Sequence, residues 1–222
     1  DDFELAVERL HGRDITQRKV NVRNISFPDS FRSLSDGVYG KRFVNYLSMR
    51  GFSLPEEVAE QYGLMYCLTG DFAWRLIFPV VWDDRLVGWT GRDIRAGAKL
   101  RYRASDGLGK DVLLAFDDDD CVATVVVEGP VDALKFDWCG RSVGVRAVAT
   151  MGTAVTEAQK DLLRDIARKT PLYVVFDAEA VPEALTLADE VNAKWVPLPS
   201  GIEDPGAMTE NAARSFLGAL AK

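Results

Sequence analysis

Four acidic side chains stand where two apolar runs of the sequence end. Glu128 and Asp177 each follow directly after a run rich in β-branched and apolar residues. Asp132 comes one helical turn after Glu128, and Glu179 comes just after Asp177. If both runs are strands of one parallel sheet, their carboxyl ends meet at the same edge, which is where such sheets bind ligands. We therefore expect Glu128, Asp132, Asp177 and Glu179 to converge.

Carboxylates gathered in this way favour a divalent cation. Like charges repel each other and do not all stay ionised unless a counter-ion lies between them. Ligation by oxygen alone suits Mg²⁺ or Mn²⁺, and two or more ions can share one such site. Both ions also bind phosphate oxygens, so the pattern predicts phosphoryl transfer. The alternative is that each acid only complements the positive end of a helix dipole.

The segments that must position these acids alternate between strand and helix after Cys121, which is typical of a parallel sheet flanked by helices. Thr156 and Gln159 have the spacing of a capping box that opens one of the helices. The expected strands are 123–127, 145–149, 172–176 and 194–196, and the expected helices are 130–138, 156–170, 182–191 and 208–220.

The first half of the sequence has a different pattern, of short helices followed by antiparallel strands. Pro55 is well placed to open a helix, and Arg50-Gly51 to end one. Aromatic and β-branched residues on both sides of Asp83-Asp84 indicate a hairpin. The expected helices are 3–10, 39–49 and 55–61, and the expected strands are 75–82, 86–91 and 100–104. The fold class is therefore α/β, with a mixed α+β N-terminal subdomain before a parallel-sheet domain.

Composition excludes several classes of protein. The 222 residues are 47% hydrophobic, and no apolar run approaches the roughly 18 to 20 residues of a membrane helix. We expect no membrane span and no signal peptide in this sequence. Three cysteines and one histidine fit neither a disulfide framework nor a zinc site, so we expect a reducing, cytoplasmic setting and no zinc in this chain.

Charge is unevenly distributed along the chain. The net charge is −7, yet residues 1–110 hold slightly more basic than acidic residues, and the acidic excess lies in 111–222. A basic strip runs from Arg85 to Lys110, and it allows polyanion binding beside an acidic metal site. The alternative is a solvated, charged hairpin. Trp82, Trp89 and Tyr102 can stack on bases, although as strand residues they are more typical of packing.

Three motifs in the second half resemble the TOPRIM domain. Residues 125–132 (VVVEGPVD) resemble its strand followed by E-G-x-x-D, and residues 149–153 (ATMGT) its turn of small residues. Residues 176–179 (FDAE) resemble its D-x-D motif. This resemblance implies that Glu128, Asp177 and Glu179 are catalytic and that, with Asp132, they bind the metal.

The upstream segments are similar to the RNA polymerase core of a DnaG-type, phage-like DNA primase. They are 46–51 (YLSMRG), 75–80 (RLIFPV), 86–92 (LVGWTGR) and 101–105 (RYRAS), and an acidic loop at 202–206 (IEDPG) completes the pattern. The resemblance implies a linker or lead-in at 1–35, a basic subdomain at 36–120, a TOPRIM domain at 121–205 and a C-terminal helix at 206–222. It also implies nucleotide or nucleic-acid contacts by Arg75, Arg92, Arg101, Arg103 and Lys110.

A primase core of this kind joins NTPs into short RNA primers on a single-stranded DNA template. The resemblance implies a replicative helicase as a partner, and a zinc-binding module whose place lies before Asp1. The sequence is consistent either with a fragment of a longer primase or with a phage protein that dispenses with the module. Two residues depart from the family: Glu179 replaces an Asp, and Pro182 replaces a Gly. The departures leave open a catalytically altered nucleic-acid-binding module, and a TOPRIM nuclease is a further alternative.

Overall fold

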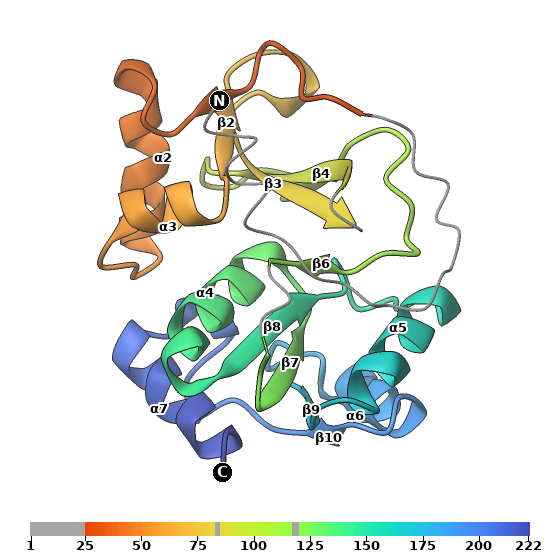
Figure 1. Cartoon of the computed structure of the whole chain (residues 1–222). Helices are drawn as coiled ribbons and strands as arrows, with labels where there is room; N and C mark the ends of the chain where they lie inside the picture. The colour runs from red at the N-terminus through yellow and green to blue at the C-terminus, as the bar shows by residue number, and fades with distance from the viewer. Residues whose placement is uncertain (1–24, 83–84, 117–119) are drawn as a thin grey trace. The chain divides into compact units, whose positions relative to one another are not determined.

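The computed structural model describes residues 25–82, 85–116 and 120–222. It forms two compact units, the first ending at Leu108 and the second beginning at Gly109 (Figure 1). Several expected features lie outside the described residues: the helix at 3–10, most of the segment 1–35, and the turn Asp83–Asp84.

An antiparallel sheet forms the centre of the first unit, with the strand order β1-β2-β3-β4-β5. Its longest pair is the hairpin of β3 and β4, rich in the β-branched and aromatic residues that favour strands. The register shifts between Val80 and Val81. The strands are β1 (Arg32–Ser33), β2 (Met65–Cys67), β3 (Arg75–Trp82), β4 (Arg85–Asp93) and β5 (Tyr102–Ala104). The expected hairpin is therefore confirmed, whereas β1 and β2 were not expected.

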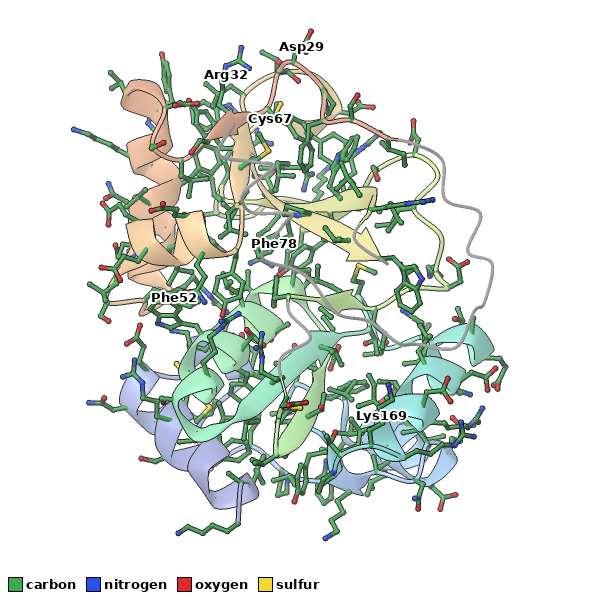
Figure 2. All side chains as sticks on the ribbon, in the orientation of Figure 1. Asp29, Arg32, Phe52, Cys67, Phe78 and Lys169 are labelled. Carbon is green, nitrogen blue, oxygen red and sulfur yellow. The ribbon has the colours of Figure 1, made fainter. Side chains whose placement is uncertain are left out.

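Both faces of this sheet are packed. On one face, Phe43 of helix α2 (Gly37–Met49) stacks on Tyr66 of β2, with ring centroids 4.8 Å apart. On the other face, Phe31 meets Trp89 edge-on at 5.3 Å. Phe78 of β3 is completely buried (Figure 2). The remaining helical segments are α3 (Pro55–Gln61) and the short 3₁₀ helix η1 (Gly70–Phe72).

A mixed sheet forms the centre of the second unit, with the order β10-β9-β7-β8-β6. All its neighbouring pairs are parallel except β6 with β8. The expected parallel sheet is confirmed, and the antiparallel edge strand β6 was not expected. The domain limits at 36–120 and 121–205 stay a prediction. The strands are β6 (Leu114–Ala115), β7 (Ala123–Val127), β8 (Val145–Ala149), β9 (Leu172–Val174) and β10 (Lys194–Trp195).

Helices cover both faces of the second sheet. Helices α4 and α7 lie on one side of it, and α5 and α6 lie on the other (Figure 1). The capping box is present, because Thr156 Oγ1 accepts from the Gln159 N–H and Gln159 Oε1 accepts from the Thr156 N–H. The helical segments are α4 (Pro130–Gly140), η2 (Arg141–Val143), α5 (Glu157–Ala167), α6 (Val181–Glu190), η3 (Pro205–Ala207) and α7 (Glu210–Leu220).

This strand order places a topological switch point at β7. The chain passes from β7 through α4 to β8, and then returns through α5 to β9 on the other side of β7. Ligands bind in such sheets outside the carboxyl ends of the strands that flank this point. Among the described helices, none is both long and apolar enough to cross a membrane.

Candidate active site

Glu128 and Asp177 meet at the carboxyl ends of neighbouring strands. β7 ends at Val127, directly before Glu128, and the chain stays buried beyond β9 until Phe176, directly before Asp177. The backbone N–H of Asp177 donates to Glu128 Oε1 at 3.0 Å. The two strands thus bring together two of the four acids at the switch point of the sheet.

One carboxylate oxygen of Asp177, Oδ1, is buried and accepts no hydrogen bond from the described residues. Burial, which removes water from the charged form, raises the pKa of Asp177 to about 7, and the negative charges of Asp132, Glu128, Asp204 and Glu179 contribute to this rise. An unpartnered carboxylate among four others is a group that a cation would stabilise.

Burial and neighbouring negative charges also raise the pKa of Glu128. Its side chain is half-buried, and this burial is the main cause that raises its pKa. The hydrogen bond from Asp177 opposes the rise, and the charges of Glu179 and Glu183 add to it. A positive charge at this edge would lower the pKa of both Glu128 and Asp177.

Asp132 helps to hold the acidic loop near this edge. Its side chain, in the first turn of α4, is buried, and Oδ1 accepts from the Gly206 N–H at 2.9 Å. The carbonyl of Glu203 accepts from the Ala178 N–H at 2.8 Å. The loop that carries Asp204 is therefore tied both to α4 and to the turn after Asp177.

Two acids of this edge were missed by the sequence analysis as site residues. Asp204 raises the pKa of Asp177, and Glu183 raises that of Glu128. Asp204 lies in the acidic loop 202–206, and the acidic composition of this loop could have identified Asp204 as a site residue. Glu183 lies in the first turn of α6, where an acid ordinarily complements the helix dipole.

The donor chemistry fits a hard divalent ion, because all these side chains offer oxygen and Asp177 Oδ1 lacks a partner within the described chain. Across 25–82, 85–116 and 120–222, however, no three Asp, Glu, His or Cys residues are grouped closely enough to hold one ion. Glu179 is exposed. The convergence of four carboxylates on one metal stays a prediction.

A network centred on Gln159 connects the turn after β8 to the segment that carries Lys110. The buried Gln159 Nε2 donates to the carbonyls of Thr150 and Val112, both at 2.9 Å. Thr156 Oγ1 donates to the Lys110 carbonyl at 2.6 Å. The Thr150 N–H in turn donates to the carbonyl of Val127, at the end of β7. The backbone at Lys110 is thereby fixed within the unit that contains Glu128.

Arg75 is hydrogen-bonded within its own unit. Its side chain is buried, and its Nη atoms donate to the carbonyls of Gly91 (3.0 Å), Leu100 (2.9 Å) and Arg101 (3.3 Å). Asp93 lies 3.7 Å away. The Nη atoms of Arg75 thus bind carbonyls of its own unit, and the nucleotide or nucleic-acid contact expected of Arg75 stays a prediction.

The other basic residues have more open surroundings. The Arg92 guanidinium lies over the Tyr102 ring, 4.9 Å from its centroid. Arg103 pairs with Asp71 at 2.6 Å on the surface, whereas Arg101 and Lys110 are exposed. The buried Trp82 and Trp89 belong to the packing of the unit, and the half-buried Tyr102 retains a surface for stacking.

Comparisons with known proteins agree with this arrangement. The sequence model of a Toprim-like family matches residues 125–192. A primase fragment of the bacteriophage T7 primase-helicase protein is similar in structure, with a TM-score of 0.63 and 16% identity. The match covers 94% of this chain and 82% of that chain.

A second similar structure is a T7 primase domain from a complex with the lagging-strand DNA polymerase and an RNA/DNA hybrid. It has a TM-score of 0.54 and 18% identity, covering 77% of this chain and 85% of that one. The comparison with curated proteins gave no significant match. Residues 125–192 thus form a Toprim-like domain, within a chain that has the fold of a phage primase fragment.

Proposed function

We propose that this chain is the catalytic core of a DNA primase, which synthesises short RNA primers on single-stranded DNA. The observation that carries the proposal is the pair of Glu128 and Asp177 at the switch point of a chain with the primase fold. The T7 fragment belongs to a primase-helicase protein, which supports a replicative helicase as a proposed partner. The zinc-binding module stays a prediction from the sequence resemblance.

The proposed reaction is attack of a 3′-hydroxyl on the α-phosphate of an incoming NTP, with pyrophosphate leaving. Glu128, Asp177 and Glu179 would hold Mg²⁺ or Mn²⁺, with Asp132 as a further candidate. Bound there, the ion would supply charge neutralisation on the phosphates. Glu128 also fixes the turn at Asp177 by accepting its N–H. The loop held by Asp132 keeps Asp204 near the same edge.

Template and nucleotide need positive charge, which this acidic chain offers only locally. We assign the contacts with their phosphates to Arg92, Arg101, Arg103 and Lys110. The decisive experiment is primer synthesis from labelled NTPs on mixed single-stranded templates with Mg²⁺ or Mn²⁺. Metal-dependent products of a few nucleotides are expected. Their absence with both ions would reject the proposal.

Charge reversal at the exposed basic residues should weaken single-stranded DNA binding. Arg101→Glu and Lys110→Glu each remove one proposed phosphate contact, so the slope of log K against log salt should become shallower by about 0.7 per contact. Fluorescence anisotropy of a labelled oligonucleotide over a salt series measures both the affinity and the slope.

Two reversals elsewhere serve as matched controls. Lys169 follows α5 (Figure 2), and Lys222 is the last residue; both are exposed. Lys169→Glu and Lys222→Glu change the net charge equally but should leave the slope nearly unchanged. Equal effects at all four positions would show that net charge, and not these contacts, governs binding.

The second candidate is a nucleic-acid-binding module without catalytic activity. Two observations favour it: Glu179 is exposed, and no three metal-ligating side chains of the described residues lie close enough together to hold one ion. Glu179 separates the two candidates. Its extra methylene makes ideal octahedral geometry harder to reach, and Mg²⁺ demands that geometry more strictly than most ions. If the chain is an enzyme, we expect more synthesis with Mn²⁺ than with Mg²⁺.

Glu179→Asp should narrow the difference between the ions, and Glu179→Ala should lower synthesis with either. Each metal is titrated into wild type and both variants, following primer yield and melting temperature together. No synthesis and no metal-dependent shift in any of the three proteins would favour the binding module.

A further inference from the structure

An arginine contacts two neighbouring aromatic rings on the surface of the first unit. The Arg42 guanidinium is 5.2 Å from the ring centroid of Trp74 and 5.9 Å from that of Tyr39. The two rings meet edge-to-face, with centroids 6.5 Å apart. Tyr39 and Arg42 belong to α2, and Trp74 directly precedes β3. The three side chains therefore form a cluster, the Trp74 cluster, between a helix and the start of a strand.

The Trp74 cluster is accessible, unlike the aromatic core of the same unit. Tyr39 is 50% exposed, Arg42 is exposed and Trp74 is half-buried, whereas Trp82 and Trp89 are each 8% exposed. Within the described chain, no carboxylate pairs with Arg42, so its positive charge is compensated only by the two rings. The cluster thus offers aromatic surface and an available charge together.

The backbone at Trp74 has an unfavourable conformation. Its φ is +60°, which costs a residue with a Cβ about 1 to 2 kcal/mol. The Trp74 carbonyl accepts from the Ile94 N–H at 3.1 Å, which helps to hold this conformation. A bulky ring kept on the surface at such a cost is typical of a position with a binding role.

A second arginine and aromatic pair lies at the same end of the sheet. Arg75 is opposite Asp93 in the pairing of β3 and β4, which places Trp74 next to the end of β4. One residue before Asp93, Arg92 lies over Tyr102. Two arginine and aromatic pairs at one end of a sheet can bind a flexible polyanion that carries planar rings at regular intervals.

We propose that Tyr39, Arg42 and Trp74 form a stacking site for unpaired bases of single-stranded nucleic acid. The inference rests on the proposed function and adds residues that the sequence analysis did not identify. Every base offers a π-face to an aromatic ring or to a guanidinium plane, so the site selects unpaired strands without selecting sequence. The charge of Arg42 complements the phosphate that follows each base.

The test separates base stacking from phosphate contacts. Binding of an oligothymidylate is compared with binding of an abasic strand of the same length, which keeps the phosphates and lacks the bases. Wild type should prefer the oligothymidylate. Trp74→Ala should weaken its binding by about 10-fold, within the range measured for loss of one stacked base, and should leave abasic binding unchanged. Trp74→Phe, which keeps a ring, should retain most of the preference.

Further variants keep the test decisive. Tyr39→Ala alters a half-exposed helix residue outside the core and should reduce the preference even if Trp74→Ala fails to fold. Trp195→Ala, at a half-buried position in the second unit, is the matched control and should change neither affinity. Equal binding of both strands by wild type, or equal losses on both strands in Trp74→Ala and Tyr39→Ala, would overturn the stacking site.

The two proposals fail in different ways. If primers are made but the bases contribute nothing to binding, the stacking site is wrong and the primase assignment stands. If the preference for bases depends on Trp74 but no primers are made, the stacking site stands and the chain is a binding module.

Discussion

Glu128→Gln is expected to abolish primer synthesis while leaving the fold intact. The substitution keeps the size of the side chain, and the amide oxygen can still accept the Asp177 N–H that Glu128 Oε1 accepts at 3.0 Å. What it removes is one negative charge at the edge proposed to hold the metal. We expect synthesis to fall by on the order of 100-fold or more.

The same change should stabilise the protein slightly in the absence of metal. Burial and the charges of Glu179 and Glu183 raise the pKa of Glu128, so the ionised form carries a cost that Gln avoids. Melting in EDTA and primer yield in Mg²⁺ measure the two effects on the same preparation. Glu56→Gln, at an exposed position in α3, is the matched control and should change neither. Normal synthesis by a folded Glu128→Gln protein would remove Glu128 from the proposed site.

Residues that determine local structure made much of the second unit predictable. β7 and β8 are fully buried, and both strands have the limits that the sequence predicts. Thr156 and Gln159 form the capping box that their spacing predicts. The run through β7 ends at Glu128, and the run through β9 ends at Asp177, so the meeting of these two acids followed from strand pairing alone.

Pairing between distant segments was not predictable in the same way. β2 is three residues long, and β6 is only two. Strands this short have no periodic pattern of their own, and they form because longer neighbours offer unpaired edges. The packing of Arg75 could not be predicted for a similar reason. Its carbonyl partners at Gly91, Leu100 and Arg101 lie in β4 and in the segment after it, which are distant in the sequence.

Surface clusters were the least predictable feature. Tyr39 and Arg42 lie one turn apart on a helix, where such a pair is ordinary. Only the tertiary structure brings Trp74 against them. Likewise, the influence of Asp204 on Asp177 depends on the loop that Asp132 holds through Gly206.

Asp177→Asn should make the metal-free protein more stable at pH 8 and less sensitive to pH. In the folded protein the pKa of Asp177 is raised from 3.8 to about 7, chiefly by burial and then by four neighbouring carboxylates. The folded state therefore binds the proton more tightly than the unfolded state does. This contribution to stability is complete below about pH 4 and is lost as the pH rises through about 7.

An asparagine stays neutral across this range and so avoids the loss. The gain in the free energy of unfolding at pH 8 should be of the order of 2 to 4 kcal/mol, since each unit of pKa difference corresponds to about 1.4 kcal/mol. Denaturant unfolding in EDTA from pH 4 to pH 8 measures the gain for the variant against wild type. Asp189→Asn, at an exposed position in α6, is the matched control and should give a curve parallel to that of wild type.

Divalent metal should affect the two proteins differently. In wild type at pH 8, Mg²⁺ or Mn²⁺ should restore the stability that ionisation of Asp177 removes, because the cation compensates the carboxylate whose Oδ1 has no partner among the described residues. In Asp177→Asn the metal should add little, and primer synthesis should be lost. Parallel pH curves for wild type and Asp177→Asn would show that the Asp177 carboxylate is already compensated within the protein, and the edge would then have no need of a cation.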